Sequence, residues 1–135
     1  MKEGWYNDNY LILFDESEIA AASDRYSLHQ LLPGYRVLGL RGWDDFIVRA
    51  ASERMYSIPT IPIDTRYLSQ FFLDEEAETA LQPDARFSGK IKRYVKPLVF
   101  GGDPHAEENV TWVNHEEHGK LVKWWNELYR RLKGF

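Results

Sequence analysis

The chain contains no cysteine among its 135 residues. Disulfide bonds, thiolate metal sites and cysteine nucleophiles are therefore excluded, and this absence is typical of a reducing compartment. No uninterrupted apolar run approaches the ~20 residues that cross a bilayer. The first ten residues also lack the apolar segment of a signal peptide. These absences predict a soluble, cytoplasmic protein with no membrane partner.

Positive charge is scarce in the first part of the chain. Residues 1–82 carry seven Lys and Arg side chains against fourteen Asp and Glu, whereas residues 83–135 carry ten against seven. An acidic surface repels phosphate groups and attracts basic proteins. We therefore expect no nucleic-acid partner, and we favour a protein partner that is basic at its contact surface.

Apolar residues, in contrast, are plentiful. Hydrophobic residues make up 44% of the chain and aromatic residues 15%. This supply of apolar surface is enough to offset the conformational entropy that folding removes. The length of the chain suits one domain, and no repeat, low-complexity tract or long linker divides it. The sequence predicts a single domain over residues 1–135.

Short apolar segments that alternate with turn residues predict an antiparallel sheet. Residues 10–14 form a β-prone run, after which Asp15 and Glu18 have the spacing of a helix capping box. A Pro-Gly turn follows, and β-prone segments at 35–40, 45–49 and 55–61 are separated by short turns. We expect a strand, a helix and an antiparallel meander in that order.

The second half of the chain ends in its strongest local pattern. Apolar spacing predicts a short helix at 65–72, a strand within 90–100 and a β segment at 110–113. Asn114 is the predicted N-cap of an amphipathic helix that ends at Gly134. The apolar stripe of this helix is predicted to be Leu121, Trp125, Leu128 and Leu132, flanked by Val122 and Tyr129. The expected fold class is α+β, with the meander packed against helices.

Three sequences follow one another in the first half of the chain: YLILFDESEI at 10–19, LPGYRVLGLRGWDD at 32–45 and MYSIPTIPID at 55–64. Over residues 10–64 their order of elements resembles the SUKH superfamily, which includes bacterial toxin-immunity proteins and fungal cell-wall regulators. Family members usually begin with helices before the first strand, whereas nine residues precede Tyr10 here. Either the C-terminal helix substitutes for those helices, or the resemblance is confined to this segment.

The resemblance implies an immunity-type protein that binds and neutralises a toxin or effector by protein–protein contact. It implies neither catalysis nor a cofactor. The candidate contact residues are acidic and aromatic groups of the meander, joined by one tryptophan of the last helix: Trp43, Asp44, Asp45, Glu53, Tyr56 and Trp124. A tryptophan beside two carboxylates offers an aromatic anchor next to charges that pair with a basic toxin. The alternative is that Trp43 packs on the sheet and the two aspartates only turn the chain.

A different hypothesis comes from residues 101–118, which begin with a Gly-Gly turn and carry His105, Asn109, His115 and His118. Their order resembles the later half of an HNH nuclease motif, in which His and Asn complete a metal site and a His base activates water. The base histidine that such nucleases place before the Gly-Gly turn is absent. An HNH-like metal-dependent nuclease, active or degenerate, is thus one alternative, and a regulatory interaction module without a toxin partner is another.

Overall fold

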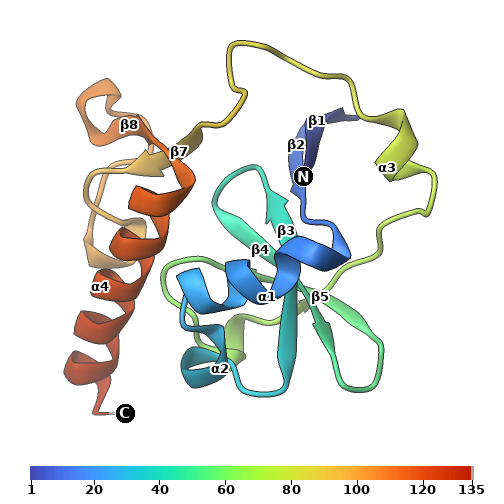
Figure 1. The fold of residues 1–135 in the computed structure, drawn as a ribbon. Coiled ribbons are helices and arrows are strands. Elements are labelled where there is room, and N and C mark those ends of the chain that lie inside the picture. The colour runs from blue at the N-terminus through green and yellow to red at the C-terminus, as the bar shows by residue number, and fades with distance from the viewer. Residues whose placement is uncertain (135) are drawn as a thin grey trace.

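The computed structural model describes residues 1–134 and has an α+β fold, which confirms the predicted class. A six-stranded antiparallel sheet follows the chain order from one edge to the other (Figure 1). Its strands are β1 (Lys2–Tyr6), β2 (Asn9–Leu13), β3 (Tyr35–Arg41), β4 (Asp45–Ala50), β5 (Met55–Pro59) and β6 (Ser69–Gln70). The predicted strands and meander are therefore present, and the structure adds β1 and β6 at the two edges.

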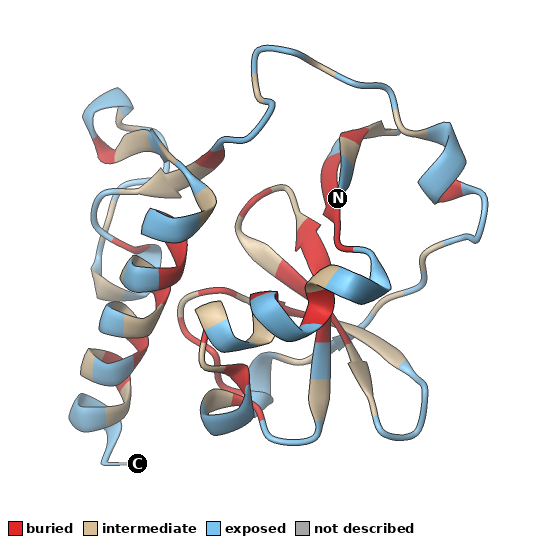
Figure 2. Ribbon diagram, in the orientation of Figure 1, coloured by how far each residue is buried: buried red, intermediate tan, exposed pale blue. Residues whose placement is uncertain are grey.

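Strand β2 is buried on both faces, which explains its continuous apolar sequence. Tyr10 and Ile12 belong to the main core, whereas Leu11 and Leu13 belong to a smaller cluster. The two sets separate because successive side chains of a strand point to opposite faces of the sheet. The buried segments run through the middle of the sheet and along one side of the last helix (Figure 2).

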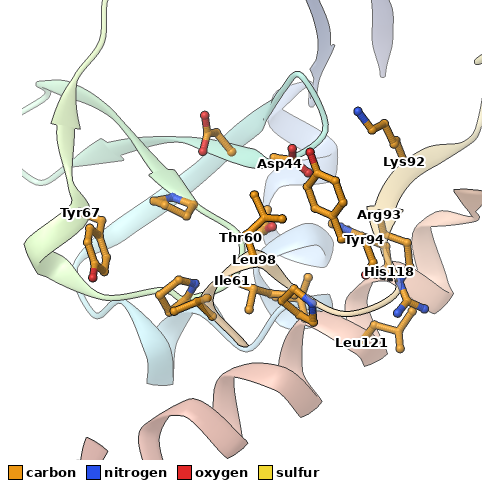
Figure 3. Close-up of a pocket in the computed structure, with 16 residues that line it drawn as sticks. Asp44, Thr60, Ile61, Tyr67, Lys92, Arg93, Tyr94, Leu98, His118 and Leu121 are labelled. Carbon is orange, nitrogen blue, oxygen red and sulfur yellow. Dashed lines mark hydrogen bonds between the residues drawn. The ribbon is translucent and has the colours of Figure 1, made fainter. Parts of the chain in front are cut away.

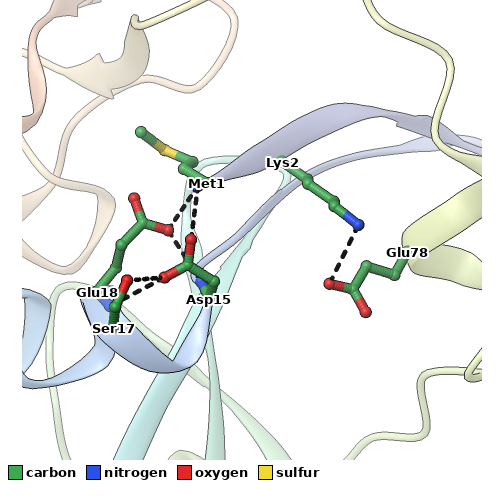
Figure 4. A network of polar contacts seen from close by, with 6 residues as sticks. All are labelled: Met1, Lys2, Asp15, Ser17, Glu18 and Glu78. Atoms are coloured by element: carbon green, nitrogen blue, oxygen red, sulfur yellow. Dashed lines mark hydrogen bonds and ion pairs between the residues drawn. The ribbon is translucent and has the colours of Figure 1, made fainter.

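Helix α1 (Glu16–Arg25) begins at the predicted capping box. The Asp15 carboxylate accepts a hydrogen bond from the Glu18 N–H at 3.1 Å, and the Glu18 carboxylate accepts one from the Asp15 N–H at 2.9 Å. The ammonium of Met1, at the start of β1, lies 2.6 Å from the Glu18 carboxylate (Figure 4). These contacts fix the direction in which α1 leaves the sheet. A short helix, α2 (Leu28–Leu31), follows α1, and another, α3 (Ala77–Ala80), lies near β1.

The last third of the chain forms a second layer beside the main sheet (Figure 1). Strands β7 (Ile91–Tyr94) and β8 (Val110–Val113) pair antiparallel, and α4 (His115–Lys133) follows them. The expected helix at 65–72 is wrong, because only the 3₁₀ turn η1 (Thr65–Tyr67) forms before β6. The expected strand at 90–100 stops at Tyr94, and the proline-containing segment after it turns into η2 (Leu98–Phe100).

Helix α4 is capped by Asn114 and ends at Gly134 as predicted, but it does not bury the predicted stripe. Leu121, Trp125 and Leu128 are half-buried, and Leu132 is 68% exposed. The buried residues lie about one position, or ~100°, around the helix, and they are His118, Gly119, Val122, Asn126 and Tyr129. Among the described residues no helix, α4 included, combines the length and apolarity needed to cross a membrane.

The rotation of α4 has a polar cause. The Asn126 side chain is completely buried and accepts a hydrogen bond from the Ile63 N–H at 2.7 Å. Its amide group donates to the carbonyl oxygens of Thr60 and Val122, both at 2.8 Å. A hydrophobic pattern assigns an asparagine to the exposed face of a helix. Here Asn126 is buried because the main-chain groups that bond to its amide lie in the protein interior. The helix is therefore held against the segment that leaves β5.

Helices α1 and α4 come into contact at Gly119. A Cβ atom at this position would lie 2.4 Å from Cγ of Arg25 and 2.9 Å from its carbonyl oxygen. Any side chain would collide with the main chain of α1, so the glycine allows the two helices to approach. This contact fixes the upper end of α4, as Asn126 fixes its middle.

Candidate functional site

A cleft of about 370 Å³ opens where the segment after β5 faces η2 and α4 (Figure 3). Its walls are mainly apolar. The residues that form most of them are Pro59, Ile61, Pro62, Leu98, Leu121 and Val122. The volume lies toward the lower end of the range for ligand pockets, roughly 300–1,000 Å³. We refer to this feature as the cleft.

Main-chain hydrogen bonds hold the first wall in place. The Thr60 N–H donates to the Asp44 carbonyl at 2.8 Å, while the Thr60 carbonyl accepts from the Asn126 amide. Pro59 and Pro62 lack amide donors, so the strand cannot continue through this segment. Hydrogen bonds therefore attach this wall to the β3–β4 turn on one side and to α4 on the other.

The opposite wall is shaped by Asn109. Its side chain accepts a hydrogen bond from the Lys96 N–H at 2.8 Å and donates to the carbonyl oxygens of Lys96 and Asp103, both at 3.1 Å. These bonds fold the chain back before Leu98 and Val99, which border the cleft. Asn109 was a candidate metal-site residue, and the structure uses its amide to close a loop.

The main polar group of the cleft is the half-buried carboxylate of Asp44. Burial raises the pKa of Asp44 to about 6, and neighbouring Asp45 acts in the same direction, against the opposing effects of Lys92 and the Tyr94 hydroxyl. Figure 3 shows Asp44 beside Tyr94. Asp45 forms an ion pair with Arg41 at 3.2 Å. Among residues 1–134, Asp44 takes part in no ion pair.

Two basic residues of β7 border the cleft, and both have other contacts. The Lys92 ammonium lies 5.6 Å from the centre of the Tyr94 ring, a cation–π distance. The Arg93 guanidinium donates to the carbonyl oxygens of Tyr94 at 3.3 Å and Val95 at 3.0 Å. Burial also lowers the pKa of Arg93. Of the two carboxylates that line the cleft, Asp45 is paired with Arg41, and Asp44 forms no ion pair with Lys92 or Arg93 within residues 1–134.

Trp43 is 8% exposed and belongs to the core. Its ring stacks on Tyr10 with the centroids 4.9 Å apart, and it meets Phe87 and Trp112 edge-on at 5.3 and 5.1 Å. The structure therefore shows the packing arrangement and not an exposed anchor. Trp43 has a left-handed backbone with φ of +65°, which places Asp44 on the other side of the turn, at the cleft.

The other candidate contact residues lie apart from one another. Glu53 is exposed in the β4–β5 turn, where its carboxylate lies 4.0 Å from Arg49. Tyr56 is half-buried on β5 and packs edge-on against Tyr35. Neither of them lines the cleft. Trp124, in contrast, is 55% exposed on α4.

Trp124 belongs to an apolar surface that the rotation of α4 leaves outside the core. We call this surface the α4 apolar face and define it as Leu121, Trp124, Trp125, Leu128 and Leu132, which recur at helical spacing. Leu98 and Val99 of η2 are 46% and 43% exposed and border the cleft, as does Leu121. The cleft thus opens onto the α4 apolar face.

The four residues of the nuclease hypothesis do not meet. His105 is exposed, and the ring nitrogens of His115 are buried without a hydrogen-bond partner in the described chain. His118 is 3% exposed, and its Nδ1 lies 2.7 Å from the Tyr26 hydroxyl. Burial lowers the pKa of His118 to about 3, which keeps the ring neutral. Within residues 1–134, no group of three or more His, Asp or Glu side chains is placed to hold a metal ion.

Comparisons with protein-family models, with curated proteins and with solved structures found no match to this chain. The function is therefore inferred from the cleft and the α4 apolar face. Sequence reasoning had singled out Asp44, Asp45 and Trp124, but it did not predict the cleft. In the sequence, the cleft is signalled only by the two prolines at 59 and 62, because they mark where β5 must end.

Proposed function

We propose that the protein is a non-catalytic binding protein of the immunity type, which binds and neutralises a toxin or effector by protein–protein contact in the cytoplasm. The observation that carries the proposal is the continuity of the cleft with the α4 apolar face. Exposed apolar surface that includes a tryptophan and adjoins a pocket is typical of protein interaction sites. Trp124 supplies the aromatic anchor, and Leu121 joins it to the cleft.

The charge around the cleft supports a basic partner. Asp44 and Asp45 line the cleft together with Lys92 and Arg93, and the two aspartates belong to the part of the chain where acidic residues outnumber basic ones two to one. Complementary charge speeds encounter and selects the partner. The resemblance of residues 10–64 to the SUKH superfamily supports the same class of function, because its bacterial immunity proteins act by protein contact.

The chemistry of the cleft supports binding better than hydrolysis. The one histidine that lines the cleft, His118, is bonded to Tyr26 and buried as a neutral ring. Asn109 is committed to main-chain groups of its own loop. A nuclease needs a metal site and a base that is free to take a proton. These residues hold the fold together instead.

The test is protection of growing cells against any growth-inhibiting protein that proves to be encoded beside this one. Co-expression is expected to restore growth, and calorimetry with the purified pair is expected to give a complex. Trp124→Ala should weaken the complex about tenfold or more, since central aromatic anchors dominate interface energy. Phe72→Ala is the matched control, because Phe72 is 81% exposed and lies outside the cleft and the α4 apolar face. A complex without protection would indicate a regulatory interaction module, and the absence of any complex with neighbouring toxins would contradict the proposal.

A further inference from the structure

We infer that the cleft receives a basic side chain of the partner, an arginine or a lysine, with its cationic group against Asp44 and its methylene stem on the apolar walls. The inference rests on the proposed function, since it names the part of the partner that enters. It can nevertheless be tested on the isolated protein with a small cation.

The lining of the cleft matches the two halves of such a side chain. Long basic side chains bury their methylene groups on apolar surface while the charged end remains polar. The cleft offers Ile61, Leu98 and Leu121 along its walls, and Asp44 with Tyr94 at one end (Figure 3). A purely apolar side chain would leave the half-buried Asp44 carboxylate with the Tyr94 hydroxyl but no ion-pair partner within residues 1–134, which is costly.

Charged residues of two strands surround Asp44. From β4, Asp45 is neutralised by Arg41 at 3.2 Å. From β7, Lys92 lies over the ring of Tyr94 and Arg93 donates to main-chain carbonyls. Lys92 and Arg93 would favour an anion if they faced the cleft alone. Because Asp44 forms no ion pair within residues 1–134, a guest cation gives this carboxylate a partner.

The cation requires an ionised Asp44. Burial and Asp45 hold the pKa of Asp44 at about 6, and Lys92 and Tyr94 reduce the shift. His118 of α4 remains neutral above its pKa of about 3 and adds no competing charge near neutral pH. Above pH 6 the carboxylate is charged and ready for a cation, whereas below pH 6 the cation has to displace a proton. Binding is therefore expected to strengthen as the pH rises through 6.

The experiment titrates the full chain, labelled for NMR, with n-butylguanidinium and with the uncharged N-butylurea of the same shape. At pH 7.5 the cation is expected to shift the amide resonances of Thr60, Tyr94 and Leu98, and to bind at least tenfold more tightly than the urea. At pH 5.0 the affinity for n-butylguanidinium should be lower by about tenfold, because only about a tenth of Asp44 is then ionised. Equal binding of the two probes, or binding that ignores pH, overturns the inference.

Two variants separate a cation site from an anion site. Asp44→Asn should abolish the preference for n-butylguanidinium over the urea, whereas Glu53→Gln, at an exposed carboxylate outside the cleft, should keep it. Lys92→Met removes a charge that repels the cation and should increase the affinity for n-butylguanidinium. Weaker cation binding by Lys92→Met would overturn the inference. If Asp44→Asn did not fold, the wild-type titration at two pH values would still decide.

The failure of this inference and of the proposed function are distinguishable. A chain that discriminates between the two probes through Asp44, but forms no complex with a neighbouring toxin, keeps the cation site and loses the immunity role. A chain that binds and neutralises a toxin equally well with Asp44→Asn keeps the immunity role. That second result shows that no basic side chain of the partner relies on Asp44, and it overturns the inference.

Discussion

Replacing Asn126 by leucine tests the polar connection that orients α4. The substitution keeps the approximate size of the side chain and removes its amide group. The Ile63 N–H and the Thr60 carbonyl then lose their bonds of 2.7 and 2.8 Å in a fully buried position. The Val122 carbonyl remains part of the helix. Two main-chain groups of the segment after β5 are thus left unsatisfied inside the protein.

The expected loss of stability follows from these two groups. A buried donor or acceptor without a partner costs ~1–3 kcal/mol. Burying an apolar side chain in place of the amide returns ~1–2 kcal/mol. Two such groups cost ~4 kcal/mol at the middle of that range, so the free energy of unfolding should fall by about 2–3 kcal/mol, a large part of the ~5–15 kcal/mol that is typical of a domain. Urea denaturation followed by tryptophan fluorescence measures this difference.

The matched control is Glu127→Leu, at the next position of the same helix. Glu127 is exposed, so the same incoming side chain should change the free energy of unfolding by no more than about 0.5 kcal/mol. If Asn126→Leu were as stable as the wild type, the hydrogen bonds of Asn126 would not be what orients α4. An equal loss in both variants would likewise refute the reasoning, because it would trace the effect to leucine on the helix.

Three further predictions concern the pH dependence and the packing of the fold. His118 has a folded pKa of about 3, below its unfolded value of about 6.5, so its contribution to stability is complete above pH 6.5 and is lost as the pH falls toward 3. The free energy of unfolding should therefore drop by about 2 kcal/mol from pH 7 to pH 5. Urea titrations at both pH values should show a flatter dependence for His118→Asn. Asp44 has a raised folded pKa of about 6, so its charge opposes folding increasingly from about pH 4 to pH 6 and fully above pH 6. Asp44→Asn should therefore be more stable than the wild type at pH 7.5 but not at pH 4. A difference in the free energy of unfolding that is the same at both pH values would contradict this. Gly119→Ala gains ~1 kcal/mol of helix propensity but places a Cβ 2.9 Å from the Arg25 carbonyl, so a net loss of ~1–2 kcal/mol in thermal unfolding is expected.

Strands β2 to β5 and helix α1 were predictable because their signals are local, whereas β1 and α2 were not predicted. The capping box of Asp15 and Glu18 lies within four residues, and the apolar run at 10–14 is continuous because β2 is buried on both faces. The turns between β3, β4 and β5 are short and carry residues suited to turns. Each of these features depends on neighbours in the sequence, so no knowledge of tertiary contacts was needed.

The orientation of α4 and the cleft were not predictable, because both depend on contacts distant in sequence. Asn126 bonds to a segment 63 and 66 positions away, and nothing in the helix pattern marks it as buried. The cleft joins residues near 60, 98 and 121, which only the tertiary fold brings together. The α4 apolar face contains the four residues of the predicted stripe, whereas the predicted flanking residues Val122 and Tyr129 are buried. The pattern identified an apolar stripe but not the side of it that faces the core.

The position of Asp44 connects the stability of the protein with its proposed function. Its main chain is held by Trp43 on one side, through a left-handed turn packed into the aromatic cluster, and by the Thr60 N–H on the other. Its carboxylate is left half-buried, where ionisation works against folding. A group that costs stability and is fixed so firmly is expected where function requires it. On the proposed function, Trp43 contributes to binding by positioning Asp44, and Trp43→Phe should weaken the partner complex without a change in the exposed surface of α4.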